Sequence, residues 1–128
     1  MSLVNQAIVL FAHGARREAW ADPFRHLCTL VRAAKPSWRV ELAFLECMSP
    51  DLPTLAQQLA QEGICEVVLV PLFLAQGGHV HDDLPHLVTK LGLQYPSLQW
   101  RITPALGEDE TLLQAIAAWV CSHTTPKA

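Results

Sequence analysis

The stretch VVLVPLFLAQGGHVHDDLPH, from Val67 to His86, decides how the rest of the chain is interpreted. It begins with four consecutive apolar residues, 67–70, which is typical of a parallel strand covered on both faces. Pro71 has no N–H group to offer a neighbouring strand, so the strand ends near this point. Gly77 and Gly78 then permit a sharp turn that brings the backbone close to a ligand. The stretch therefore predicts a buried strand that leads into a polar loop at the edge of a sheet.

Two histidines and two aspartates follow this glycine pair. In an extended segment, residues two apart face the same way, so His79 and His81 are expected to address one space. Asp82 or Asp83 is expected to cap a helix that ends at Gly92. Either carboxylate could also orient a histidine that binds a metal, as an outer partner of the ligand.

Strands and helices are expected to alternate along the whole chain. The predicted strands are 7–12, 40–45, 67–70 and 98–103, and the predicted helices are 22–35, 50–62, 82–91 and 109–121. Such an order favours right-handed crossovers and a parallel sheet. We therefore predict a doubly wound, flavodoxin-like α/β fold, a three-layer sandwich with a four-stranded parallel sheet. Residues 1–128 form one domain, and 122–128 are expected to fray.

The details of the helices are also predicted from their sequences. Asp22 is expected to cap the first helix, with Pro23 at its first position, and Ser49 is expected to cap the second. The last helix is expected to bury one apolar stripe. Its members are Leu112, Leu113, Ile116 and Val120.

Composition limits the classes of partner. The net charge of −3 and the absence of a basic run argue against binding to nucleic acid. The apolar run 7–12 is far too short to span a membrane. The four cysteines form no CxxC pair, which favours reduced thiols in the cytoplasm. Hydrophobic residues make up 51% and charged residues 16%, so part of the surface is expected to be covered by another subunit.

Three chemically active side chains are expected at one edge of the sheet. His13 follows the first strand, Glu46 follows the second, and His79 lies in the connection after the third. In a sheet of order 2-1-3-4 these strand ends are neighbours, at the place where such folds bind ligands. Two imidazoles and a carboxylate suit Co²⁺, Ni²⁺, Fe²⁺ or Zn²⁺, and they could equally act as bases. Arg16 and Arg17 lie where an anionic substrate could be held.

A structural interpretation of the same region remains open. Glu46 could be a solvated charge at a strand end, and Cys47 is expected to be a small buried side chain. Asp82 and Asp83 could do no more than cap a helix.

The chain resembles the small CbiX-type sirohydrochlorin chelatases over nearly its whole length. The resemblance is carried by FAHG at 11–14 with Arg16, AFLE at 43–46, PLFL at 71–74, Gly77, His79 and DLP at 83–85. It implies a chelatase-like fold and an ATP-independent enzyme that inserts a divalent metal, usually cobalt, into sirohydrochlorin for cobalamin synthesis. Ni²⁺ or Fe²⁺ would be the alternatives. The metal is a substrate, and no organic cofactor is implied.

The resemblance also implies roles for individual residues. His13 and His79 correspond to the histidines that bind the metal and accept pyrrole protons, and Glu46 corresponds to the acidic residue that assists them. Small members of the family pair as homodimers. Ala15 departs from the family, which commonly has Ser after His-Gly, so a hydroxyl that could hold a histidine or a substrate carboxylate is missing.

Other functions remain as alternatives. A carrier of the same fold would bind a metal or tetrapyrrole without turnover, and a siroheme-type ferrochelatase would insert iron. A phosphoryl-transfer enzyme with a nucleophilic His13 ranks low, because Ala12 stands where histidine phosphatases carry Arg. A purely structural domain ranks lowest, because it would not need His13, Glu46 and His79 at one edge.

Overall fold

Four parallel strands form the centre of the molecule. The structure, a computed structural model, describes residues 4–75, 78–124 and 126, and at residues 78–81 it describes the backbone only. The sheet has the order β2-β1-β3-β4, and every neighbouring pair is parallel. Its strands are β1 (Gln6–Ala12), β2 (Arg39–Phe44), β3 (Glu66–Pro71) and β4 (Gln99–Ile102). The predicted doubly wound α/β fold is therefore confirmed.

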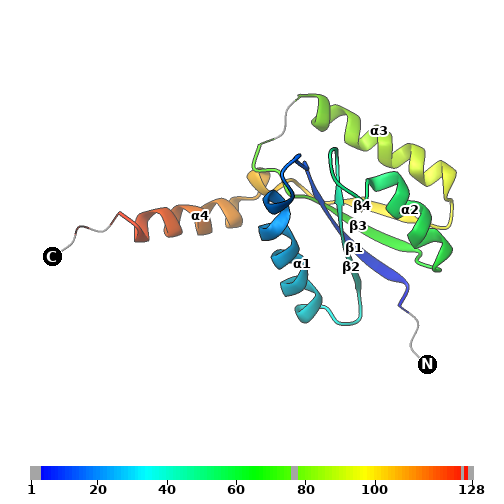
Figure 1. Ribbon diagram of the computed structural model, residues 1–128, viewed down its shortest axis with the longest axis horizontal. Coiled ribbons are helices and arrows are strands. Elements are labelled where there is room, and N and C mark those ends of the chain that lie inside the picture. The colour runs from blue at the N-terminus through cyan, green and yellow to red at the C-terminus, as the bar shows by residue number, and fades with distance from the viewer. Residues whose placement is uncertain (1–3, 76–77, 125, 127–128) are drawn as a thin grey trace.

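Helices cover both faces of this sheet, and the last helix projects away from it (Figure 1). They are α1 (Asp22–Ala34), α2 (Leu52–Gln61), α3 (Gly78–Gln94) and α4 (Glu110–Ser122), with short 3₁₀ helices at Glu18–Ala21 and Leu106–Glu108. α2 and α3 pack on one face over the buried residues of β1 and β3, whereas α1 packs on the other face over β1 and β2. The strand residues alternate between these two cores, as the period of a strand requires.

The starts of two helices differ from the sequence prediction. Asp22 is the first residue of α1, and Ala21 occupies the N-cap without a side-chain hydrogen bond, because the 3₁₀ helix Glu18–Ala21 runs directly into α1. Asp51, rather than Ser49, caps α2, and its Oδ1 accepts a hydrogen bond from the Thr54 N–H at 2.8 Å. The prediction thus places the cap of α1 one residue too late and the cap of α2 two residues too early.

The third helix begins earlier than expected. α3 starts at Gly78, so residues 79 and 81 lie in its first turn and not in an extended segment. Asp82 and Asp83 are then interior helix residues, which overturns their assignment as caps, and the helix passes Gly92 to end at Gln94. The prediction that His79 and His81 address one space assumed an extended backbone, and the backbone here is helical, while both side chains lie outside the described residues.

The last helix contradicts the prediction of a buried stripe. α4 leaves the body of the molecule (Figure 1), and within the described chain none of its residues is buried. Leu113, Ile116 and Val120 are 37%, 36% and 46% exposed. Its N-cap, Asp109, accepts a hydrogen bond from the Leu112 N–H at 2.9 Å. None of the described helices has the length and apolarity needed to cross a bilayer.

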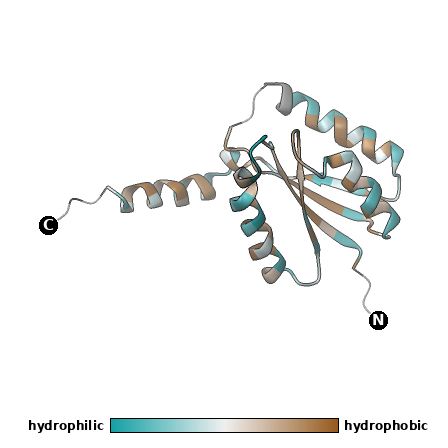
Figure 2. Ribbon diagram, viewed as in Figure 1, coloured by the Kyte–Doolittle hydropathy of each residue, from teal (hydrophilic) through white to brown (hydrophobic). Residues whose placement is uncertain are grey.

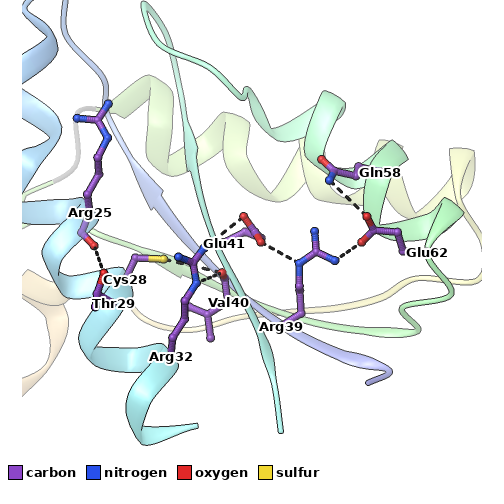
Figure 3. A network of polar contacts seen from close by, with 9 residues as sticks. All are labelled: Arg25, Cys28, Thr29, Arg32, Arg39, Val40, Glu41, Gln58 and Glu62. Carbon is purple, nitrogen blue, oxygen red and sulfur yellow. Dashed lines mark hydrogen bonds and ion pairs between the residues drawn. The ribbon is translucent and has the colours of Figure 1, made fainter. Parts of the chain in front are cut away.

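A polar network closes the amino-terminal end of β2 (Figure 3). Arg39 donates to Glu41 at 2.8 Å and also bonds Glu62, the residue that follows α2. The hydrogen bonds to Glu41 and then Glu62 raise the pKa of Arg39, and Arg39 holds the pKa of Glu62 below its usual range. The network lies at the opposite end of the sheet from the strand ends that carry His13 and Glu46, so its role is to tie β2 to α2.

Candidate functional site

His13 and Glu46 meet at the carboxyl edge of the sheet, as the sequence predicts. The register pairs Ala12 at the end of β1 with Phe44 at the end of β2. His13 Nε2 and Glu46 Oε1 are 2.8 Å apart, a hydrogen bond in which the protonated ring nitrogen donates to the carboxylate. The pair lies between the end of the central strand β1 and the end of the edge strand β2. The position of the pair therefore follows from the order of the strands.

Gly14 allows the two strand ends to come this close. Its φ of +90° is a conformation that other residues rarely adopt. A Cβ atom at this position would stand 1.8 Å from the Glu46 carbonyl oxygen. Beyond the strands, the Leu45 N–H donates to Ala12 O at 2.9 Å and the Glu46 N–H to His13 O at 3.1 Å. The backbone of the site is therefore fixed before any ligand arrives.

Phe73 supports His13 from the side of β3. The two ring centroids are 6.3 Å apart with an interplanar angle of 81°, an edge-to-face contact. Phe73 also stands edge to face with Phe11, at 6.0 Å, and is 7% exposed. This role of Phe73 cannot be predicted from the sequence, because no local pattern reveals a contact between rings sixty residues apart.

The pair is open to solvent and chemically suited to a divalent metal. The His13 and Glu46 side chains are 51% and 58% exposed. Metal bonds of about 2.1 Å to each, meeting at about 90–110°, would set the two donor atoms roughly 3.0–3.4 Å apart. A small opening of the hydrogen bond would therefore admit a metal ion between them. Among the described residues no three His, Cys, Asp or Glu side chains are grouped to hold a metal.

A hollow of about 610 Å³ adjoins Glu46. Its lining consists of Glu18, Arg25, Leu45, Glu46, Cys47, Met48, Ser49 and Asp51. Arg25 bonds both Glu18 and Asp22, the latter at 3.2 Å, so its charge is already compensated. The hollow therefore presents a carboxylate-rich wall that favours a cation over an anion.

Cys47 is exposed, and the expectation that it is buried is wrong. Its φ of +67° turns it out of the β2 direction, since the loop folds back so that the Phe44 N–H donates to the Pro50 carbonyl oxygen at 2.9 Å. All four cysteines of the chain are free thiols. Cys28 is the buried one, and burial raises the pKa of its thiol.

Arg16 and Arg17 lie just beyond the pair and are exposed. Among the described residues neither guanidinium has an ion-pair partner, in contrast to Arg25, Arg32 and Arg39. Two uncompensated positive charges therefore stand beside His13, where they could hold substrate carboxylates.

The remaining predicted site residues fall partly outside what the structure describes. Gly77 lies outside the described residues, and Gly78 is the first residue of α3. The side chains of His79 and His81 are likewise outside the description, so their roles stay predictions. Asp82 and Asp83 are exposed, and among the described residues no hydrogen bond joins either aspartate to His13 or Glu46.

Curated relatives share the chain's sequence over most of its length. A sirohydrochlorin cobaltochelatase from Sulfurisphaera tokodaii is 27% identical over 109 residues, which cover 85% of this chain and 86% of that protein. A sirohydrochlorin ferrochelatase from Bacillus subtilis is 26% identical over 116 residues, 88% of this chain but 43% of that protein. The chain thus spans less than half the length of some relatives and most of the length of others.

Solved structures share the fold. The CbiX protein from Marinobacter aquaeolei has a TM-score of 0.81 at 26% identity, covering 92% of this chain and 96% of that one. The sirohydrochlorin chelatase SirB from Bacillus subtilis subspecies spizizenii, solved in complex with cobalt, has a TM-score of 0.71 at 25% identity over 92% of this chain and 50% of that one. The model of the CbiX family itself matches residues 7–122. With the sheet order and the strand-end pair already in place, that match shows that this chain belongs to the CbiX family.

Proposed function

We propose that this protein is a sirohydrochlorin chelatase, an enzyme that inserts a divalent metal into the tetrapyrrole without ATP. The observation that carries the proposal is the His13–Glu46 pair, held at 2.8 Å at the carboxyl edge of the sheet and open to solvent. The names of relatives from Sulfurisphaera tokodaii and Bacillus subtilis support the substrate and the reaction.

The reaction exchanges two protons for one metal ion. Two pyrrole N–H protons must leave the macrocycle while M²⁺ sheds water and takes their place between the four ring nitrogens. His13 accepts a proton at a ring nitrogen, and the neighbouring Glu46 carboxylate can take it on toward solvent. Because the pair supplies two ligands rather than a full set, the metal is held weakly enough to move into the ring.

The surroundings of the pair suggest how the two substrates approach. The carboxylate-rich hollow beside Glu46 suits the hydrated cation. Arg16 and Arg17 suit the carboxylates of sirohydrochlorin, which approaches from the His13 side. His79 and the glycines 77 and 78 complete this proposal, with His79 as second base and ligand and the glycines as close backbone contacts.

We propose Co²⁺ as the metal and cobalamin synthesis as the pathway. The short relative from Sulfurisphaera tokodaii, which this chain covers over most of its length, is named a cobaltochelatase, and this supports the choice. Imidazole and carboxylate ligands alone do not select among Co²⁺, Ni²⁺ and Fe²⁺, so the choice also depends on metal supply. The four free cysteines favour a reducing compartment, and the cytoplasm is the proposed location. We further propose that the enzyme acts as a homodimer.

The proposal is tested by an anaerobic absorbance time course with sirohydrochlorin and Co²⁺, with and without protein. The spectrum of the macrocycle changes when metal enters it. Acceleration over the protein-free blank is expected, and parallel runs with Ni²⁺ and Fe²⁺ rank the metals at equal concentration. Tight binding of the tetrapyrrole with no acceleration by any of the three metals would contradict the proposal and favour a carrier.

A further inference from the structure

The plane of the His13 imidazole is not fixed by the Glu46 hydrogen bond alone. The torsion that turns an imidazole about its Cβ–Cγ bond is broad, so neighbouring groups must hold the ring in one plane. The His13 side chain is 51% exposed, and among the described residues its one hydrogen bond joins Nε2 to Glu46 Oε1 at 2.8 Å. That bond fixes one ring atom and leaves the ring free to turn about it. A second contact is therefore needed to hold the plane.

Phe73 supplies this second contact. Its ring stands edge to face with the imidazole, at a centroid distance of 6.3 Å and an interplanar angle of 81°. Aromatic rings prefer this arrangement, and a turn of either ring would break it. Phe73 also stands edge to face with Phe11, at 6.0 Å and 83°, and Phe11 is 1% exposed. The three rings thus lead from the buried apolar core (brown in the central strands of Figure 2) to the exposed imidazole.

The backbone of Phe73 is held from two sides. On one side, the Leu72 N–H donates to Phe11 O at 2.8 Å, so the chain stays beside β1 after β3 has ended. On the other side, the Gly107 N–H donates to Phe73 O at 3.2 Å. A Cβ atom at Gly107 would stand 1.5 Å from Leu74 O, so any side chain there would push this segment away. The turn that contains Gly107 therefore sets where the Phe73 ring lies.

We propose that Phe73 is a positioning residue for metal insertion, which holds the His13 imidazole in the orientation that accepts the pyrrole proton, and that the turn at Gly107 keeps Phe73 in place. The inference rests on the proposed function, in which His13 is that base. Proton transfer requires an aligned acceptor, and a displacement of about 1 Å in a reacting group can cost about 10²-fold in rate. Because Phe73 is 7% exposed, it acts through His13 rather than on the substrate.

The first test removes the ring. Phe73→Leu is expected to lower kcat for Co²⁺ insertion about tenfold, because the imidazole then occupies its productive orientation only part of the time. The KM for sirohydrochlorin should stay at the wild-type value, since no substrate contact is lost. Ile64→Val is the matched control, because Ile64 is 3% exposed in the same apolar core and lies just before β3, at the other end of the sheet. The control should lower Tm and leave kcat unchanged.

The second test displaces Phe73 without changing any of the three rings. Gly107→Ala is expected to lower kcat as Phe73→Leu does, again with KM unchanged. It should also weaken the nuclear Overhauser cross-peak between the ring protons of Phe73 and His13, measured without substrate. Gly92→Ala is the matched control, because outside its own helix an added Cβ there approaches Trp100 Cδ1 no closer than 3.9 Å, an ordinary contact. Both kcat and the cross-peak should survive in Gly92→Ala.

The cross-peak separates this inference from the proposed function. A wild-type protein that shows the cross-peak, loses it in Gly107→Ala and yet inserts no metal would support the orientation of His13 by Phe73 and contradict the proposed function. Absence of the cross-peak from the wild type would overturn the inference whatever the activity. So would a wild-type kcat in Phe73→Leu, or a loss of kcat that Ile64→Val shares, because either result would leave Phe73 a purely structural role.

Discussion

Gly14 allows His13 and Glu46 to lie within hydrogen-bond distance of each other. Its positive φ and the 1.8 Å approach of a Cβ to Glu46 O together exclude any other residue without a shift of the backbone. The hydrogen bond from the Glu46 N–H to His13 O runs through this same turn. Gly14 therefore positions the backbone of both His13 and Glu46.

Substitution of Gly14 separates this positioning from ordinary glycine strain. Gly14→Ala is expected to lower kcat for metal insertion by about 10²-fold, because a displacement of about 1 Å in a catalytic group costs that much. Gly63→Ala is the matched control, since Gly63 has a φ of +83° but nothing within 4 Å of an added Cβ. Both variants should lose stability from φ strain, Gly14→Ala more than Gly63→Ala because its Cβ also meets the Glu46 carbonyl oxygen, and only Gly14→Ala should lose kcat. Equal kcat in the two variants would contradict the positioning role.

The sequence predicts the pair but not what holds it. His13 and Glu46 follow apolar runs whose ends are visible in the sequence, and parallel neighbours end at one edge, so their meeting follows from strand order. The Phe73 contact and the outward turn of Cys47 depend on tertiary packing and a local positive φ, which leave no periodic signal. The role of His79 stays a prediction.

The start of α2 depends on one hydrogen bond to the side chain of its N-cap residue. Asp51 accepts from Thr54, and hydrogen bonds from the side chain and backbone of Thr54 lower the pKa of Asp51. Ser49 satisfies the same sequence rule and stands two residues earlier. The bridge from Phe44 to Asp51 and the hydrogen bond from the Phe44 N–H to Pro50 O keep Asp51 extended beside the end of β2, so α2 starts beyond Ser49.

Substitution of Asp51, but not of Ser49, should therefore destabilise the protein. Asp51→Ala is expected to lower the free energy of unfolding by about 1 kcal/mol, measured by urea denaturation at neutral pH. Ser49→Ala is the control and should change it by less than about 0.5 kcal/mol. A larger loss of stability in Ser49→Ala than in Asp51→Ala would contradict this and support Ser49 as the cap.

The stabilisation of the fold by Asp51 should decrease as the pH falls. Because its pKa is lower in the folded than in the unfolded protein, the carboxylate stabilises the fold above its unfolded pKa. That contribution is lost as pH falls through the folded value. The difference between wild type and Asp51→Ala should thus shrink as pH is lowered from about 5 to about 2. A difference that grows on acidification would contradict the assignment.

The start of α3 is harder to predict than that of α2. The glycine pair suggests a loop, yet the helix begins at Gly78, because apolar residues further along, including Leu84, Val88 and Leu91, bury a stripe against the sheet. Tertiary burial outweighs the poor helix propensity of glycine and the presence of Pro85 inside the helix. Asp82 and Asp83 therefore lie within α3 rather than at its N-cap.

On the scale of the whole molecule, the net charge does not attract sirohydrochlorin, which carries carboxylates, toward the site. The net charge is −3, so recognition must come from local cations. Arg16 and Arg17 are the cations beside His13 that the described residues leave unpaired. Substrate affinity should therefore depend on these two residues more than on other basic residues.

Arg16→Ala should accordingly raise KM for sirohydrochlorin by about tenfold with kcat nearly unchanged, the mark of a lost ground-state contact. Lys90→Ala, an exposed position on α3, is the control and should leave both constants as they are. Raising the salt concentration should weaken binding in the wild type more than in Arg16→Ala. An unchanged KM in Arg16→Ala would remove the residue from the substrate site.

The sheet and its helix layers are predicted by hydrophobic periodicity, whereas the place of α4 is not. Its apolar stripe has the same pattern as that of a helix packed on its own sheet, and the pattern does not say whether that sheet covers it. The direction in which α4 leaves the body depends on tertiary contacts of the turn before it, where the Gly107 N–H donates to Phe73 O at 3.2 Å and an added Cβ at Gly107 would stand 1.5 Å from Leu74 O.

The most direct test of the account is the initial rate of Co²⁺ insertion by His13→Ala, followed anaerobically by absorbance beside the wild type. The control is His26→Ala, an exposed histidine on α1. His13→Ala is expected to lose about 10²–10⁴-fold in rate while its Tm and its binding of sirohydrochlorin stay close to the wild-type values, because a solvent-exposed strand-end imidazole contributes chemistry rather than packing. Retention of the wild-type rate by His13→Ala, or a loss of rate that only parallels a loss of Tm, would contradict the central role of the His13–Glu46 pair.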